Sequence, residues 1–270
     1  MQHFTRLGLK QLIATCYDAS FSQLSLFEDY DDNGALISKP KTAYQAVINE
    51  VTAGQSIQEL VKSKVNRLTL LDENGDFASE ECVLLMKNAD VVITNPPFSL
   101  FRALLHLLNQ LEKDYVLLGP SQAITYSESF QLFQTGQLHL GVTPFSSGLD
   151  FEVPRGSPFD KERDGVFYKS VPIAWFTSFG VNSPPQKLQL TKSFDPHCYP
   201  KLDDNEAVIN VDTILEIPRD YKGQMAVPIT FLKVWDKHDF ELLGKMDKAM
   251  VGGQEKFTRL LIQRIKNKEN

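Results

Sequence analysis

The residues with the clearest chemical use are Asn95, Pro96, Pro97 and Phe98, which read NPPF and directly follow the apolar run DVVIT. The side-chain oxygen of Asn95 and the carbonyl of Pro96 can accept both N–H hydrogens of an exocyclic amine on a nucleobase. Binding of this kind steers the nitrogen towards tetrahedral geometry, so that its lone pair can attack a methyl group. The two prolines hold the acceptors rigid because they fix φ and remove backbone donors. The pattern therefore predicts methylation of a base amine.

Phe98 adds an aromatic face on which a base flipped out of a duplex can stack. A simpler alternative for the same four residues is a turn after a strand, with the ring packed inward. The surroundings favour the functional interpretation, because a buried strand is expected before the segment. Leucines at helical spacing follow it, at positions 100, 104, 107, 108 and 111.

The elements that would position NPPF alternate between short apolar strands and helices. Strands are expected at residues 10–16, 67–71, 90–94 and 115–118, and helices at residues 43–51, 57–64, 78–88, 100–111 and 126–134. This alternation predicts an α/β fold with a parallel sheet, completed by antiparallel strands at residues 138–142 and 171–176. Ligands of such sheets bind outside the carboxyl ends of the strands, so we expect Asp18, Asp76 and Asn95 to meet on one rim.

The C-terminal part of the chain differs from the rest in composition and charge. The stretch VNSPP at residues 181–185 indicates a linker, and strands are expected near residues 224–232 and 257–265. Residues 245–270 carry seven basic and three acidic side chains, although the whole chain has a formal charge of −6. This local excess indicates either a solvated basic tail or a surface for DNA phosphates. The candidate phosphate contacts are Lys256, Arg259 and Arg264.

Composition and spacing exclude several other classes of protein. Hydrophobic residues are 42% and charged residues 23%, which is typical of a globular chain and not of a disordered one. The apolar runs are far shorter than the roughly 20 residues of a membrane span, and the N-terminus does not resemble a secretory leader, so we expect a cytoplasmic protein. The three cysteines and five histidines show no metal-ligand spacing, so neither a disulfide framework nor a metal site is expected.

Over nearly its whole length, the sequence resembles the adenine-specific DNA methyltransferases of the EcoRI type. The blocks that carry the resemblance are LGLKQLIATCYD, NGDFASEEC, ADVVITNPPFSLFR, QAITY and VINVDTILEIPRDYKGQMAVPITFL, in the order of the family. The resemblance implies a Rossmann-like methyltransferase sheet, S-adenosylmethionine as the methyl donor and an adenine amino group in duplex DNA as the acceptor. It also implies recognition of a short sequence, in a restriction-modification system or a mobile element. We expect a monomer.

The same resemblance implies roles for individual residues. Residues 95–98 match the catalytic loop of the family. Asp76 falls where related methyltransferases place an acid that hydrogen-bonds the adenine of the cofactor, and Phe77 would pack on that ring. Asp76 could also cap the helix that follows it. Asp18 falls where the ribose hydroxyls of the cofactor are held, although a solvated loop acid is an alternative.

The chain departs from the family pattern at its front. It contains no G-x-G, and no strand and loop precede LGLKQLIATCYD, where family members hold the methionine part of the cofactor. Residues 1–180 are therefore predicted to form a catalytic domain that lacks its first strand and carries an insertion at residues 144–168. Residues 181–270 are predicted to form a C-terminal region, which is the candidate for DNA recognition.

Two other functions stay open at this point. NPPF also serves methyltransferases that act on RNA bases or on glutamine amides, although the C-terminal blocks favour DNA. A shortened remnant that only binds nucleic acid is the second alternative, and the departure at the front supports it.

Overall fold

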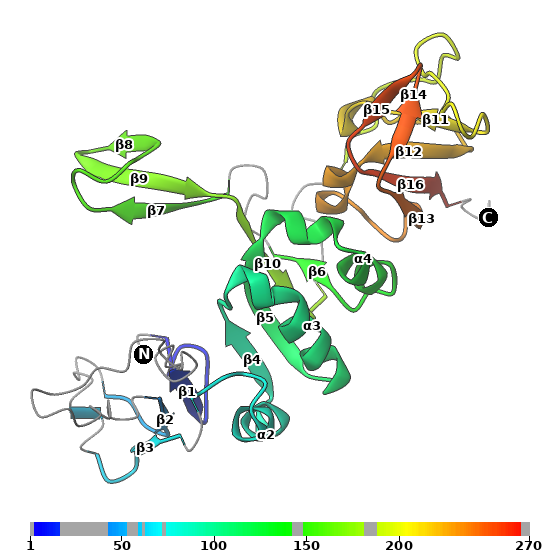
Figure 1. The fold of residues 1–270 in the computed structure, drawn as a ribbon. Coiled ribbons are helices and arrows are strands. Elements are labelled where there is room, and N and C mark those ends of the chain that lie inside the picture. The colour runs from blue at the N-terminus through cyan, green and yellow to red at the C-terminus, as the bar shows by residue number, and fades with distance from the viewer. Residues whose placement is uncertain are drawn as a thin grey trace, which may run out of the picture. The chain divides into compact units, whose positions relative to one another are not determined.

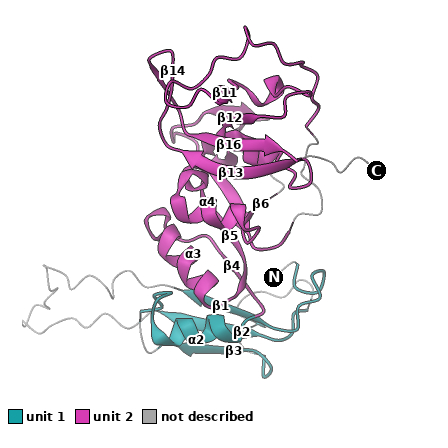
Figure 2. Ribbon diagram, turned by 90° about the vertical axis from the view of Figure 1, so that its right-hand side faces the viewer, with its two compact units in different colours: residues 1–89 teal, residues 90–270 magenta. Residues whose placement is uncertain are grey.

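The computed structural model describes residues 3–16, 43–52, 59–60, 63–71, 74–141, 148–180 and 188–265. The chain divides into two compact units, unit 1 at residues 1–89 and unit 2 at residues 90–270 (Figure 2). Each unit has its own β-sheets. The boundary that the composition indicates near residue 181 lies inside unit 2 and stays a prediction.

Unit 1 contains a three-stranded antiparallel sheet in the order β1-β2-β3. The strands are β1 (Leu12–Cys16), β2 (Tyr44–Ile48) and β3 (Arg67–Leu70). Phe4, Ile48 and Leu60 form its buried cluster. Phe4 comes from the turns before β1 and Leu60 from the chain between β2 and β3, so local connections supply the core of this small sheet.

Two predictions for unit 1 were wrong. The strands at residues 10–16 and 67–71 were expected in a parallel sheet, but β1 and β3 both pair antiparallel with β2. Residues 43–51 were expected to be helical, but they contain β2, in which Val47 lies between Ile13 and Arg67 of the neighbouring strands. Cross-strand partners of this kind stabilise β-branched residues in a sheet, and a local sequence window does not show them. The helix expected at residues 57–64 is seen only at Glu59 and Leu60 among the described residues.

Helix α2 (Glu80–Asn88) confirms the helix expected at residues 78–88. Ser79 is its N-cap, and its hydroxyl accepts a hydrogen bond from the Cys82 amide at 3.2 Å. Acidic residues in the first turn and Lys87 in the last turn complement the helix dipole. The helix buries Cys82 and Met86.

The central sheet of unit 2 has the order β4-β5-β10-β6 (Figure 1). Its strands are β4 (Val91–Thr94), β5 (Asp114–Pro120), β10 (Ile173–Thr177) and β6 (His139–Leu140). β4 and β5 are parallel, whereas β10 is antiparallel to both β5 and β6. The positions of these four strands agree with the predictions, but β4 was expected to be buried, and its residues Val91 and Ile93 are exposed.

The helical elements of this sheet lie in its connections. They are η2 (Phe98–Leu100) and α3 (Phe101–Gln110) between β4 and β5, followed by η3 (Ser121–Thr125) and α4 (Ser127–Gln134) after β5. α3 buries one face, formed by Phe101, Leu104, Leu105 and Leu108. The expected amphipathic helix after NPPF is therefore confirmed.

A second sheet of unit 2 interrupts the chain between β6 and β10. It is antiparallel, has the order β7-β9-β8 and consists of β7 (Leu149–Val153), β9 (Val166–Val171) and β8 (Lys161–Arg163). The insertion expected at residues 144–168 covers most of this sheet, although residues 142–147 lie outside the described chain. Asp164 and Gly165 have φ of 51° and 78° and form the tight turn between β8 and β9.

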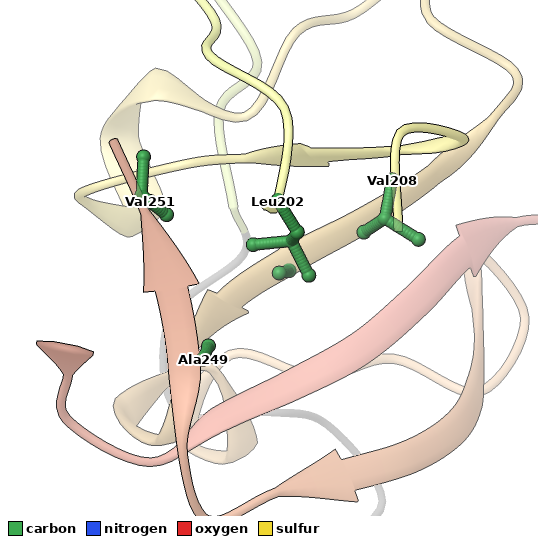
Figure 3. Close-up of a cluster of buried hydrophobic side chains, with 5 residues drawn as sticks. Leu202, Val208, Ala249 and Val251 are labelled. Carbon is green, nitrogen blue, oxygen red and sulfur yellow. The ribbon is translucent and has the colours of Figure 1, made fainter. Parts of the chain in front are cut away.

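The C-terminal part of unit 2 is a four-stranded sheet in the order β11-β12-β16-β13. Its elements are β11 (Val208–Asn210), η4 (Ile214–Glu216), β12 (Gln224–Pro228), η5 (Ile229–Lys233), β13 (Phe240–Met246) and β16 (Arg259–Arg264), with a hairpin of β14 (Ala249–Val251) and β15 (Gln254–Lys256). The strands expected near residues 224–232 and 257–265 are seen as β12 and β16, although the second half of the first prediction is the 3-10 helix η5 and not a strand. Leu202, Val208, Ala226, Ala249 and Val251 form a buried cluster in this part (Figure 3).

The architecture is therefore α/β, with mixed sheets and a small number of helices. Parallel pairing occurs between β4 and β5 and between β11 and β12, and the other strand pairs of the described residues are antiparallel. The finer Rossmann-like arrangement stays a prediction. Within the described residues, no helix has the length and apolar character that crossing a membrane requires.

Candidate active site

The NPPF segment, residues 95–98, leaves the carboxyl end of β4 and enters η2 and then α3. Pro96 is buried, whereas Asn95, Pro97 and Phe98 are exposed. The Pro97 carbonyl accepts a hydrogen bond from the Leu100 amide at 2.9 Å, which begins the helical turn. The segment is thus fixed from one end by the sheet and from the other by the start of a helix.

The polar side chain of this segment takes no part in the hydrogen bonds of the described residues. None of the described residues forms a hydrogen bond with the Asn95 amide group, which is exposed at the end of β4. The ring of Phe98 is 43% exposed and packs against no other described aromatic ring. The alternative in which Phe98 packs inward is therefore not what the structure shows. An amide acceptor and an aromatic face are both accessible to a ligand here.

The helix behind NPPF is anchored by a close approach to the sheet. Phe101, which is fully buried, lies against Gly119 of β5 and Phe176 of β10. A Cβ atom at Gly119 would be 2.3 Å from the Phe101 ring, so only glycine fits this position. The rings of Phe101 and Phe176 are 5.1 Å apart and tilted by 59°, a favourable arrangement for aromatic pairs.

A cation lies on the first turn of α3, next to the segment. The guanidinium carbon of Arg102 is 3.9 Å from the centre of the Tyr126 ring, which follows η3 in the QAITY block. The residue before it, Thr125, offers its carbonyl to Lys245 of β13 at 2.6 Å. The QAITY and NPPF blocks thus lie side by side in unit 2. The sequence indicated no role for Arg102, Tyr126 or Lys245, although two of the blocks that carry the family resemblance contain Arg102 and Tyr126.

The second motif, the NGDF turn at residues 74–77, belongs to unit 1. The Asp76 amide donates to Oδ1 of Asn74 at 3.0 Å, and Oδ1 of Asp76 accepts from the Ala78 amide at 2.9 Å. Gly75 has a φ of 75°, and a Cβ atom there would be 2.5 Å from the Cys16 carbonyl oxygen. The turn therefore packs directly against the end of β1.

The sequence left two roles open for Asp76, a cap of the following helix and a contact to the cofactor. The structure bears on the first. The N-cap of α2 is Ser79, so Asp76 caps the turn before the helix and not the helix itself. No described residue hydrogen-bonds the second carboxylate oxygen of Asp76, and the side chains of Asp76 and Phe77 are partly buried. One oxygen is thus available to a ligand.

The remaining cofactor candidate, Asp18, lies outside the described residues. Asp76 is in unit 1 and Asn95 is in unit 2, and the structure describes each unit by itself. The expected meeting of Asp18, Asp76 and Asn95 on one rim therefore stays a prediction.

The three basic candidates for DNA contact lie on or next to β16, and they differ in exposure. Arg259 is buried; it donates to Asn210 at 3.2 Å and forms an ion pair with Asp212 at 3.3 Å. Lys256 lies 3.4 Å from the same carboxylate with 26% of its side chain exposed, and Arg264 donates to the Arg219 carbonyl. Arg259 therefore has an internal role, which leaves Lys256 and Arg264 as candidates for phosphate contact.

The charges in this cluster shift its pKa values. The hydrogen bond from Asn210, together with the nearby Lys256 and Arg259, holds the pKa of Asp212 below its ordinary value. Burial lowers the pKa of Arg259, and the Asp212 carboxylate opposes that shift. Because the Asp212 carboxylate neutralises the Arg259 guanidinium, β16 can carry a buried arginine within the sheet.

Two other features of the described residues do not add to the site. A cavity of about 250 Å³ in unit 1 is lined by none of the predicted site residues but by Gln11, Val47, Asn49, Lys64, Val65, Asn66 and Arg67. In the part of the chain that the structure describes, no three His, Cys, Asp or Glu side chains gather as ligands of a metal would.

Comparisons with known proteins place the chain in a family. The family model described as adenine-specific methyltransferase EcoRI matches residues 1–270. The Type II methyltransferase M.MpnI of Mycoplasma pneumoniae is 38% identical over 70% of this chain and 62% of its own length. M.MgeORF184P of Mycoplasma genitalium is 32% identical over 89% of this chain and 68% of its own length.

The Type II methyltransferase M.EcoRI of Escherichia coli is 30% identical over 97% of this chain and 79% of its own length. No solved structure matches the chain significantly. Because the match to the family model extends over all 270 residues and includes the NPPF segment and the NGDF turn, the chain belongs to the adenine-specific methyltransferase EcoRI family.

Proposed function

We propose that this protein transfers a methyl group from S-adenosylmethionine to the exocyclic amino group of adenine in duplex DNA, as part of a restriction-modification system. The observation that carries the proposal is the Asn95 side chain, which is exposed at the end of β4 without a partner among the described residues. It adjoins a buried proline in a chain of the adenine-specific methyltransferase EcoRI family. Relatives named as Type II methyltransferases support the restriction-modification context.

In this reaction the chain supplies positioning and electrostatic stabilisation. Oδ1 of Asn95 and the Pro96 carbonyl accept the two N–H hydrogens of the adenine amino group, so that the nitrogen lone pair turns towards the methyl carbon. With the methyl donor bound, the C–N bond would form as the bond from that carbon to sulfur breaks, and the surplus proton would pass from the nitrogen to water while Asn95 and Pro96 hold the amine in place. Phe98 stacks on the flipped base and keeps it in register with the two acceptors.

S-adenosylmethionine, when bound, supplies an electrophilic methyl group. The residues of the NGDF turn fit its adenosine part, because Asp76 keeps one carboxylate oxygen unpaired within the described residues and can accept a hydrogen bond from the 6-amino group of the adenine. Phe77 is partly buried next to it and offers an apolar surface. Asp18 is proposed to hold the ribose hydroxyls.

We further propose that the protein reaches DNA partly through its C-terminal sheet. Lys256 and Arg264 lie at opposite ends of the β16 region, and phosphate contacts from such cations position a duplex without reading its sequence. The monomeric state and the assignment of residues 181–270 as the DNA-recognition region also belong to this proposal. The comparisons give no support to an RNA base, a glutamine amide or a non-catalytic remnant.

Product identification tests the proposed reaction. The protein is incubated with S-adenosylmethionine that carries a tritiated methyl group and with duplex DNA containing all four bases in varied contexts. The DNA is then digested to nucleosides and separated. We expect the label in N6-methyl-2′-deoxyadenosine, and we expect methylation at one defined DNA sequence. Label in N4-methylcytosine, in RNA supplied as a competitor, or in protein would contradict the proposal.

A further inference from the structure

Lys245 on β13 has a largely buried side chain, and its ammonium group is hydrogen-bonded within the protein. Its side chain is 8% exposed, and Nζ lies 2.6 Å from the Thr125 carbonyl and 2.5 Å from a carboxylate oxygen of Asp247. Removing an ammonium group from water is costly unless it is paired and hydrogen-bonded. The two contacts therefore fix Lys245 and, with it, the end of η3.

The segment held by Lys245 leads directly to Tyr126. The Tyr126 amide donates to the Ala123 carbonyl at 3.2 Å, and its carbonyl accepts from the Phe130 amide at 2.9 Å, so its backbone is part of the η3–α4 junction. A second side-chain contact from the same region supports the junction, because Gln134 of α4 donates to the Leu242 carbonyl of β13 at 2.9 Å. β13 thus holds both ends of the segment that contains Tyr126.

Tyr126 in turn positions Arg102. The Arg102 guanidinium lies 3.9 Å above the Tyr126 ring, is exposed, and forms no ion pair with any described carboxylate. Arg102 lies in the first turn of α3, where the helix dipole disfavours a positive charge. The aromatic ring compensates for this through a cation–π contact, which leaves the hydrogen-bonding edge of the guanidinium available.

We propose that Arg102 binds a phosphate of the target strand next to the flipped adenine, and that Lys245 is the positioning residue that holds it there through Thr125 and Tyr126. The inference rests on the proposed function and adds a contact to it. The position fits, because Arg102 follows Phe98 by one helical turn, and an unpaired guanidinium matches the geometry of a phosphate. In this arrangement the C-terminal sheet, through β13, controls the geometry of the target-base site.

The test compares Arg102→Met, Lys245→Met and the double variant in the full chain, with Lys245→Arg as the rescue and Lys248→Met as the control. Lys248 is exposed and lies three residues from Lys245. Binding to duplex DNA is measured as a function of salt, and methyl transfer is measured in a single turnover. Arg102→Met should reduce the steepness of the dependence of log K on log salt by about 0.9, the value for one phosphate.

The Lys245 ammonium group is buried and already paired with Thr125 and Asp247. Lys245→Met should nevertheless lower the single-turnover rate about tenfold, because misplacement of a contact by a fraction of an ångström is costly. The double variant should be no slower than the slower single variant, Lys245→Arg should recover most of the rate, and Lys248→Met should match the wild type. Rate effects that multiply in the double variant, or an unchanged salt slope in Arg102→Met, would overturn the proposal.

A measurement without catalysis separates this inference from the proposed function. Hydrogen exchange of the peptide that spans residues 121–130 should be faster in Lys245→Met than in Lys248→Met. Exchange that is equal in the two variants would show that Lys245 does not hold the segment. If the wild type forms no N6-methyladenine while this exchange difference and the Arg102 salt slope are observed, the proposed reaction fails but the phosphate contact and its support do not.

Discussion

The NPPF segment and the NGDF turn both present a polar side chain after a strand, but they are stabilised in opposite ways. In NPPF, the prolines and the buried position of Pro96 fix the backbone, and the exposed Asn95 side chain forms no hydrogen bond with the described residues. In NGDF, the side chains of Asn74 and Asp76 form the turn, and Gly75 makes the close approach to Cys16 possible. A side chain that the fold does not use can serve the transition state alone, whereas Asp76 must serve both folding and binding.

The largest expected effect comes from Asn95→Ala, compared with Asp76→Asn. Asn95→Ala should lower the single-turnover methyl-transfer rate by at least about 100-fold, or about 2.7 kcal/mol, with little change in the affinity for cofactor or DNA. Asp76→Asn retains an oxygen for the Ala78 amide and should mainly weaken cofactor binding, by about tenfold. Rapid quench kinetics and calorimetric titration with S-adenosylhomocysteine measure the two effects.

Asn88→Ala, at the exposed end of α2, is the matched control for Asn95→Ala. The comparison between the two loops breaks down if Asn95→Ala mainly weakens cofactor binding, or if Asp76→Asn slows the chemical step at saturating cofactor.

Gly75→Ala, compared with Gly8→Ala, tests how strongly the NGDF turn depends on close packing. These two glycines of unit 1 have positive φ, 75° at Gly75 and 65° at Gly8, but a Cβ atom meets nothing within 4 Å at Gly8 and meets the Cys16 carbonyl at Gly75. Gly8→Ala should cost about 1 kcal/mol of unfolding free energy, and Gly75→Ala about 2–4 kcal/mol with a loss of cofactor affinity. Urea denaturation measures both, and equal costs would mean that the turn can move away from β1.

Phe98→Ala, compared with Phe77→Ala, separates the two aromatic residues. Phe98→Ala should weaken the capture of a flipped 2-aminopurine, which replaces the target adenine, by about 1–3 kcal/mol, because a base loses its stacking surface. Phe98→Trp should be tolerated. Phe77→Ala should leave the 2-aminopurine fluorescence unchanged and weaken cofactor binding. A fluorescence change of the same size in both variants would contradict the division of roles.

Ser79→Ala gives the smallest expected effect and refines the assignment of Asp76. The hydroxyl of Ser79 caps α2, so its loss should lower the unfolding free energy by about 0.5–2 kcal/mol. Cofactor affinity should remain that of the wild type, because the NGDF turn keeps its own hydrogen bonds. A thermal unfolding curve combined with a cofactor titration checks this, and a parallel loss of affinity would show that the cap and the turn act as one unit.

The sequence predicted the central sheet of unit 2 well, because its determinants are local. A short apolar strand, two prolines and leucines at helical spacing describe β4, NPPF and α3 in order, although β4 is not buried as expected. The parallel β4–β5 pair follows from the helix between its strands. Unit 1 was predicted less well. A short apolar run such as that of β1 does not reveal its partner, and β2 begins only at Tyr44, too far along the chain for a local sequence window to indicate the pairing.

The functional residues show the same contrast between features that are local in the sequence and contacts between distant residues. Asn95 and Phe98 are recognised from four consecutive residues, whereas the burial of Arg259 depends on Asp212, far away in the chain. Lys245 was counted as one of several C-terminal basic residues, because nothing near it in the sequence indicates a contact with Thr125. Non-local polar pairs of this kind cannot be read from charge patterns alone.

The β7-β9-β8 sheet bears on the order in which unit 2 folds. β5 and β10 pair with one another although this sheet separates them in the chain, as the register Leu118↔Trp175 shows. The tight turn at Asp164 and Gly165 lets β8 and β9 form from contacts close in sequence, and pairing of Leu149 with Val171 then brings the ends of the insertion together. The loop that must close to join β5 to β10 becomes shorter, which reduces its entropy cost by a few tenths of a kcal/mol. Pairing of β8 with β9, followed by β7, thus shortens the loop that has to close before β5 and β10 can complete the central sheet.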